Sequence, residues 1–204
     1  MSAIAVSSCN GGPAAHAYGV YTHDTRVLVR LDYDYNGDGR IDVRTFIRDG
    51  RPLRLEADSN SDGLIDRWEY YAPSGQLLRI GGSTESDGLE DTWVFPNGEQ
   101  RVIEISTGRD GRVDRREFYQ GDVLLRAESD TNRDGLPDRW EEFRDGVITR
   151  LLVDDEQRLG RPTRRLTYQG EAVRIETDVD GDGHFERLVD TSDGPADDSN
   201  GATH

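Results

Sequence analysis

Lysine is absent from the 204-residue chain, and cysteine and methionine occur once each. All 25 basic residues are therefore arginines, and 41 acidic residues outnumber them to give a formal net charge of −16. Nucleic acid and anionic membranes would repel such a chain, so we expect neither as a partner, whereas cations are natural counterparts. One cysteine cannot form an internal disulfide, and no apolar run approaches the ~20 residues needed to cross a bilayer. With only 33% hydrophobic residues, the chain can build only a thin core.

The two ends of the chain show no hydrophobic periodicity. We predict a disordered segment or lipoprotein linker at residues 1–16, one repeat domain at 17–190 and a disordered acidic tail at 191–204. Cys9 ends the run AVSSC, which is similar to the end of a bacterial lipoprotein signal and makes Cys9 a candidate lipidation site. The residues before it lack a charged segment and a full apolar stretch, which favours the alternative of an unlipidated segment.

The strongest internal signal is a repeated acidic segment. Residues 58–69 (DSNSDGLIDRWE) return as 130–141 (DTNRDGLPDRWE) with nine of twelve positions identical. The seven copies begin 23 to 25 residues apart, which is the signature of a tandem repeat array. Strong copies begin at Asp34, Asp58, Asp130 and Asp178, and weaker ones at Ser83, Ser106 and Asp154.

A glycine turn lies midway between successive acidic loops. Pairs such as Asp49-Gly50 and Asp145-Gly146 favour tight hairpins, because glycine accepts the positive φ that these turns need. Aliphatic residues then alternate with Arg or Glu, as in residues 53–56 (LRLE), and no span is long enough for a helix. The sequence predicts an all-β fold: about seven β-hairpins in an antiparallel meander or solenoid, capped by an incomplete unit at about residues 17–31, with the acidic loops along one edge.

The acidic loops have the composition of a calcium site. Ca²⁺ prefers six to eight oxygen ligands in a flexible cage. Counted from the first residue of each loop, positions 1, 3, 5, 9 and 12 supply side-chain oxygens, position 6 is a glycine that allows a sharp bend, and position 7 supplies a carbonyl oxygen. The expected ligands of the 58–69 loop are Asp58, Asn60, Asp62, Leu64, Asp66 and Glu69.

Over these twelve positions the sequence resembles EF-hand loops, but hairpins replace the flanking helices. A closer resemblance is to the calcium loops of secreted bacterial proteins such as dockerin modules and to thrombospondin type 3 repeats, and the hairpin spacing is similar to MORN-type repeats. This resemblance implies extracellular modules that calcium orders, and it covers about residues 26–190. Without helices, the sensor output of an EF-hand is not available.

Copies of the loop differ in their ligand sets. Thr45 and Val189 stand at position 12 of the Asp34 and Asp178 loops, so we expect weaker sites there. In the Asp154 loop, arginines and Pro162 replace ligands and we expect no ion. The remaining candidate ligands are Asp34, Asn36, Asp38, Arg40 and Asp42; Glu85, Asp87 and Asp91; Asp110, Asp114 and Glu117; Asp130, Asn132, Asp134, Leu136, Asp138 and Glu141; and Asp178, Asp180, Asp182, His184 and Glu186.

Each of these features also has a simpler, purely structural interpretation. A single Asp-rich turn can be only a turn, but clustered carboxylates repel one another unless a cation lies between them, which favours about four to six bound Ca²⁺ ions. The repeat-spaced Trp68, Trp93 and Trp140 could form a carbohydrate-binding platform, although packing on a sheet face is commoner. No histidine has a neighbouring nucleophile, so we do not expect an enzyme.

Together these patterns predict an extracellular or bacterial cell-surface protein that calcium rigidifies and that has a structural or adhesive role. A thin sheet with one apolar face must cover that face by coiling, by closing or by meeting another copy, so a homo-oligomer or fibre is one of three hypotheses. The alternative function is carbohydrate binding through the tryptophans.

Overall fold

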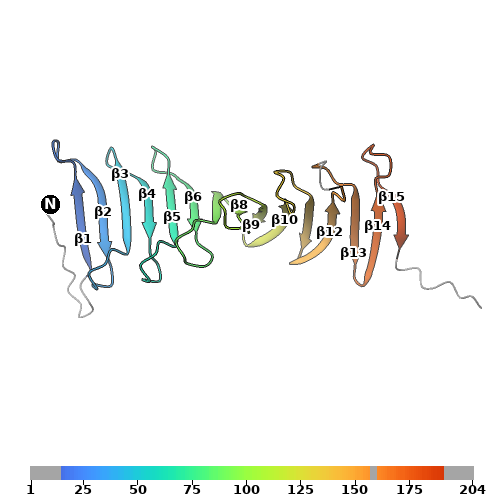
Figure 1. Cartoon of the computed structure of the whole chain (residues 1–204), viewed down its shortest axis with the longest axis horizontal. Helices are drawn as coiled ribbons and strands as arrows, with labels where there is room; N and C mark the ends of the chain where they lie inside the picture. Colours follow the sequence, from blue (N-terminus) through green and yellow to red (C-terminus); the bar gives the residue numbers. More distant parts are fainter. Residues whose placement is uncertain (1–14, 157–159, 191–204) are drawn as a thin grey trace, which may run out of the picture. The chain divides into compact units, whose positions relative to one another are not determined.

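The computed structural model describes residues 15–156 and 160–190 (Figure 1). These residues form fifteen β-strands and no helix, and they divide into two compact units, the first ending at Val113 and the second beginning at Asp114. The prediction of an all-β tandem hairpin array is confirmed. Residues 1–14 with Cys9, and the tail 191–204, lie outside the described residues. No described segment is a helix long and apolar enough to span a bilayer.

Within each unit every strand pairs with its chain neighbour in antiparallel fashion, so that each unit is a meander (Figure 1). The strands of the first unit are β1 (His16–Tyr21), β2 (Leu28–Asp34), β3 (Val43–Arg48), β4 (Arg51–Ala57), β5 (Arg67–Tyr71), β6 (Leu77–Gly82), β7 (Thr92–Asn97) and β8 (Gln100–Ile105). Those of the second unit are β9 (Arg115–Gln120), β10 (Val123–Ser129), β11 (Arg139–Arg144), β12 (Val147–Val153), β13 (Arg164–Gln169), β14 (Ala172–Thr177) and β15 (Glu186–Asp190).

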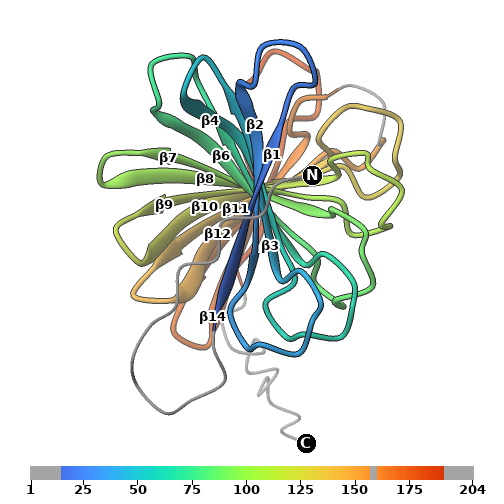
Figure 2. The same ribbon diagram turned by 90° about the vertical axis from the view of Figure 1, so that its left-hand side faces the viewer.

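The connections alternate between two kinds. Each acidic loop follows an even-numbered strand and each glycine turn follows an odd-numbered one, so within a unit the two kinds lie at opposite edges. In the turn between β3 and β4, Asp49 and Gly50 have φ values of 52° and 73°, as a two-residue hairpin turn requires. The register shifts by one residue just before this turn, between Phe46 and Ile47, which is a bulge that increases local twist. Viewed end-on, successive strands of the first unit fan out (Figure 2).

The core of the sheet is very small. Among the described residues, the buried hydrophobic side chains are Ala57, Trp68, Trp93 and Ala127. The largest side chains that are less than 2% exposed include the carboxylates of Asp34, Asp42, Asp91 and Asp154. The best-buried groups therefore lie at the acidic-loop edge rather than on a sheet face, which is the reverse of an ordinary hydrophobic core.

Arginine replaces much of the missing apolar packing on the faces of the strands. The Arg126 guanidinium lies 3.6 Å from the ring centroid of Phe118, directly across the β9–β10 pair, and Arg126 also pairs with Glu128 two residues along the same strand. Arg79 lies 4.1 Å from the ring centroid of Tyr70 in the same way. Such contacts contribute about 0.5–1 kcal/mol each at exposed sites, so they stabilise the sheet without a second layer.

Candidate metal-binding loops

The first residue of each acidic loop organises the backbone of that loop. In the 58–69 loop, the Asp62 and Gly63 N–H groups donate to the Asp58 carboxylate at 3.1 and 2.8 Å. Gly63 has φ of 96° and Ser61 at position 4 has φ of 61°, so the chain makes two left-handed steps around this carboxylate. A charged acceptor with two N–H donors anchors the bend strongly, which explains the recurring Asp at position 1 and Gly at position 6.

The same geometry recurs in the other strong copies. In the 130–141 loop, Asp134 and Gly135 donate to Asp130 at 3.1 and 2.8 Å. In the Asp34 loop the donors are Gly37 and Gly39, at 2.6 and 3.0 Å, and in the Asp178 loop they are Gly181 and Gly183, at 2.7 and 3.2 Å. The position-6 glycine thus donates to the first carboxylate in all four loops, while the second donor is position 5 in the Asp58 and Asp130 loops and position 4 in the other two.

Positions 3 and 5 turn their oxygens back toward the loop. The Asn60 side-chain oxygen accepts the Asp62 N–H at 3.0 Å, and the Asp62 carboxylate accepts the Leu64 N–H at 2.8 Å. Equivalent bonds in other copies join Asn132 to Asp134, Asp134 to Leu136, Asn36 to Asp38, Asp38 to Arg40, Asp180 to Asp182 and Asp182 to His184.

The ninth residue closes the loop. Asp66 accepts the Ser59 N–H with both oxygens at 3.1 Å, and Asp138 accepts the Thr131 N–H at 3.0 Å and its hydroxyl at 2.8 Å. In the Asp34 loop, Asp42 accepts the Tyr35 N–H at 2.8 Å, and in the Asp178 loop Glu186 accepts the Val179 N–H at 3.2 Å. These bonds bring the ninth carboxylate to the start of its own loop.

A backbone ladder joins successive loops. The N–H of each first residue donates to the carbonyl of the ninth residue in the preceding loop, as from Asp58 to Asp42 at 2.8 Å and from Ser83 to Asp66 at 3.0 Å. In the second unit Asp130 donates to Asp114 at 2.9 Å and Asp154 to Asp138 at 2.9 Å. Within each unit, the acidic loops are thus held in fixed register beside one another, one loop for each pair of strands.

The twelfth-position glutamates lie in strands and have other partners. Glu69 of β5 pairs with Arg67 and accepts the Tyr71 hydroxyl. Burial and this hydrogen bond to a carboxylate raise the pKa of Tyr71 to about 12. Glu141 of β11 is buried between Arg139 at 2.7 Å and Arg115 at 3.0 Å.

Glu117 of β9 resembles Glu69 in its contacts, because it pairs with Arg115 at 2.8 Å and accepts the hydroxyl of Tyr119. The side chains at positions 1, 3, 5 and 9 accept backbone N–H groups of their own loop, but among the described residues a group of three acidic oxygens within 4.8 Å of one another occurs only in the Asp178 loop, at positions 1, 3 and 5. The position-12 glutamates form arginine pairs on the strands instead. The sequence pattern alone did not distinguish these roles. Position 12 follows the loop in the sequence but lies in a strand, so the pleat of the sheet sets the direction of its side chain.

The Asp178 loop gathers three carboxylates most closely. Oxygens of Asp178, Asp180 and Asp182 lie within 4.8 Å of one another. A guanidinium from the preceding loop is also present, since Arg161 Nη1 lies 2.8 Å from an Asp178 oxygen. The hydrogen bonds from Gly181 and Gly183, together with Arg161, outweigh burial and lower the pKa of Asp178.

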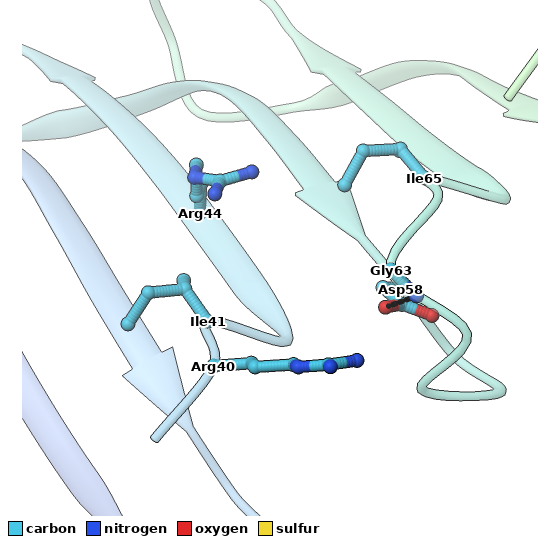
Figure 3. Close-up of a pocket in the computed structure, with 6 residues that line it drawn as sticks. All are labelled: Arg40, Ile41, Arg44, Asp58, Gly63 and Ile65. Carbon is cyan, nitrogen blue, oxygen red and sulfur yellow. Dashed lines mark hydrogen bonds between the residues drawn. The ribbon is translucent and has the colours of Figure 1, made fainter. Parts of the chain in front are cut away.

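Arg40 occupies a comparable place between the first two loops. It lines a hollow with Asp58, Gly63 and Ile65, and Figure 3 shows its side chain running toward the Asp58 carboxylate. Position 7 thus faces the following loop, and the sequence analysis did not anticipate this side-chain role for Arg40. In the 130–141 loop, position 7 is Leu136, and its side chain lies under Gly160 of the next loop.

In the Ser83 loop the three acidic side chains converge on one arginine. Arg109, at position 4 of the following loop, places Nη1 2.5 Å from Glu85 and Nε 3.0 Å from Asp91, and its Nη2 pairs with Asp87. Burial alone would raise the pKa of Asp91, but hydrogen bonds from Thr84 and Arg109 outweigh burial and lower it. Asp87 has a lowered pKa chiefly because of Arg109.

The Ser106 loop uses a hydroxyl where the strong copies use a carboxylate. The Gly111 N–H donates to Ser106 Oγ at 3.2 Å, and Ser106 Oγ lies 3.4 Å from Asp110. At its ninth position, Asp114 is buried and lies 3.7 Å from Nε of Arg133, which is again at position 4 of the next loop.

The Asp154 loop is one residue longer than the others. The Gly160 N–H donates to Asp154 at 3.0 Å, so Gly160 takes the role of the sixth-position glycine. Thr163, whose carbonyl accepts the Asp178 N–H at 2.8 Å, replaces the ninth-position aspartate. Pro162, which is ninth in this loop by direct count and was expected to replace a ligand there, is therefore displaced from the ninth position by an insertion; residues 157–159 lie outside the described residues.

Two of the three repeat-spaced tryptophans are buried on the sheet, whereas Trp140 is only partly buried. Trp68 and Trp93 are each 8% exposed and flank Gly81 across neighbouring strands. The Glu90 side chain covers Gly81 so closely that a Cβ there would overlap it, and Glu90 accepts the Tyr70 hydroxyl at 2.8 Å. Such burial leaves little ring surface for a sugar and favours the packing role of these residues.

Comparison with known sequences gave no match: neither a protein-family model nor a curated protein matches the chain. Support for a function therefore comes from the geometry of the acidic loops.

Proposed function

We propose that the chain is an extracellular, calcium-stabilised repeat protein with a structural or adhesive role. Calcium would bind in the four strong loops, through Asp34, Asp58, Asp130, Asp178 and the residues at positions 3, 5 and 9 of each. These donors are all oxygens, as a hard cation requires, and the carbonyls of Arg40, Leu64, Leu136 and His184 stand at position 7. When bound, the ion would supply the positive charge that offsets the repulsion between the carboxylates.

The observation that supports this proposal is the contrast between complete and degraded loops. In the Ser83 loop an arginine neutralises the carboxylates. No arginine among the described residues forms an ion pair with Asp58, Asp62 or Asp66, although Asp58 is only 6% exposed. The Asp130 loop is alike in this respect. Asp58 has Arg40 across the hollow but no ion pair with it. Acidic side chains held in one loop without an ion-paired partner repel one another, so these two loops are where a dissolved cation would contribute most.

The proposed extracellular location follows from the calcium affinity expected of such loops. Extracellular modules bind calcium with Kd values of about 10⁻⁴ to 10⁻³ M, which suits millimolar extracellular calcium. Because the ion would bind the folded loops and not the unfolded chain, its binding free energy would add to the stability of the sheet.

Calorimetric calcium titration of the chelated protein tests the proposal. We expect uptake of about four ions per chain, with a higher melting temperature and a stronger β signal in circular dichroism. Asp66→Asn should remove one ion, because it weakens the ninth-position ligand of a complete loop. The matched control is Asp24→Asn, which removes the same charge from an exposed turn residue outside the acidic loops.

A chelated sample that keeps its melting temperature and takes up no calcium would overturn the proposal. Equal calcium uptake by the two asparagine variants would overturn the assignment of Asp66.

A further inference from the structure

Four arginines approach acidic loops from neighbouring loops, namely Arg40, Arg109, Arg133 and Arg161, and Arg109 makes the most complete set of contacts. Its guanidinium pairs with three carboxylates of the Ser83 loop, at positions 3, 5 and 9. These are the side chains that the loop pattern assigns to a metal ion. The Arg109 side chain is only 23% exposed, and the Asp91 side chain with which it pairs is 2% exposed.

The backbone explains how Arg109 reaches this place. Position 4 is left-handed in six loops: Ser61 has φ of 61°, Ser86 of 52°, Arg109 of 56° and Arg133 of 62°, and the glycines Gly37 and Gly181 have 74° and 80°. At Ser61, Arg109 and Arg133 the side chain in this conformation contacts the preceding loop. Even a short side chain makes the contact, because Ser61 Oγ lies 3.2 Å from the Asn36 amide nitrogen and 3.5 Å from an Asp42 oxygen.

We propose that Arg109 is the built-in cation of the Ser83 loop, so that this loop needs no calcium, and that the choice of serine or arginine at position 4 of the following loop decides whether the Asp34 and Ser83 loops take a metal ion. Serine at position 61 leaves the Asp34 loop open to calcium, whereas arginine at position 109 fills its neighbour. This inference rests on the proposed function, since it divides the loops into calcium-binding and arginine-filled ones.

Two reciprocal substitutions test the inference in the full chain. Arg109→Ser should lower the melting temperature in chelator, because Glu85, Asp87 and Asp91 lose their counter-charge, and millimolar Ca²⁺ should restore it with one additional ion bound per chain. The matched control is Arg112→Ser, an exposed arginine three residues later, which changes the net charge equally and should add no ion.

Ser61→Arg is the reverse experiment. Arginine is already accepted at this φ in two other loops, so the variant should fold, and its guanidinium should reach Asp42 and remove one calcium ion from the wild-type number. Ser59→Arg is the control, because residue 59 is an exposed position of the same loop.

The outcomes separate the two proposals. A wild-type chain that takes up no calcium overturns the proposed function. The role of Arg109 is then tested separately, because the melting temperature of Arg109→Ser with and without calcium still shows whether the ion replaces the guanidinium. If wild type binds calcium but Arg109→Ser gains no ion, or is destabilised without recovery in calcium, the role of Arg109 is overturned. If Arg109→Ser does not fold in either condition, Ser61→Arg decides, and an unchanged ion count in that variant overturns the inference.

Discussion

Asp91 combines deep burial with an unusually dense set of donors. Besides Arg109, it accepts the Thr84 N–H at 3.0 Å and the Thr84 hydroxyl at 2.7 Å. These bonds favour the charged form, so the pKa of Asp91 is lower in the folded chain than its ordinary value of 3.8. A lowered pKa means that the contribution of Asp91 to stability is present above about pH 4 and is lost as the pH falls through the folded value.

Thr84→Val therefore gives a pH-dependent prediction. The variant should lose about 1 kcal/mol of unfolding free energy at pH 7, because the Asp91 carboxylate loses a hydroxyl donor. The loss should shrink as the pH falls through the lowered pKa of folded Asp91, where the carboxylate becomes protonated. Urea unfolding at pH 7 and at a series of pH values below 4 measures the difference. The control is Thr25→Val, whose exposed hydroxyl contacts only Thr22; a pH-independent loss at Thr84 would contradict the assigned role of Asp91.

The hairpin is the next larger unit, and its glycines are not equivalent. Gly50 has φ of 73° in the turn between β3 and β4, where a side chain is strained even though the space around it is open. Gly82 at the end of β6 has no positive φ and equally open space. Only the first position requires glycine for its backbone conformation.

Alanine substitutions at these two positions should act in opposite directions. Gly50→Ala should lower the unfolding free energy by about 1 kcal/mol through left-handed strain. Gly82→Ala should raise it by about 0.5 kcal/mol, because it reduces the freedom of the unfolded chain without strain in the strand. Thermal unfolding in saturating calcium measures both. Equal destabilisation by the two changes would contradict the turn geometry.

Considered as a whole, the chain buries charge more than it buries hydrocarbon. Four described hydrophobic side chains are buried, while large apolar residues such as Leu53, Leu78 and Val147 are 38%, 51% and 65% exposed. The heat-capacity change of unfolding scales with the apolar surface that becomes exposed. A monomeric chain should therefore have a heat-capacity change well below the ~12–15 cal/mol/K per residue of ordinary globular domains.

Scanning calorimetry at several protein concentrations measures this quantity and tests the proposed self-association. A value in the ordinary range, with a melting temperature that rises with concentration, would indicate that copies cover one another's apolar faces, as the fibre proposal requires. An ordinary value independent of concentration would contradict the thin-core description.

Much of this protein's structure was predictable from its sequence, because each repeat is determined by residues that lie close together in the sequence. The period of about 24 residues, the alternating strands and the paired turn residues such as Asp49-Gly50 predicted the hairpins and the edge on which the acidic loops lie. Position 1 and the glycine at position 6 were predictable for the same reason, since their hydrogen bonds stay within one loop.

Only the tertiary structure decided what neighbouring loops do to one another. The pairing of Arg109 with the preceding loop joins residues 18 to 24 positions apart, and nothing in the local pattern shows which way an arginine at position 4 turns. The pleat placed Glu69 and Glu141 in arginine pairs, and Thr163 was recognised as a ninth-position residue only from its place in the backbone ladder. A short-range pattern determines which oxygens a loop contains; strand pairing determines which charges surround them.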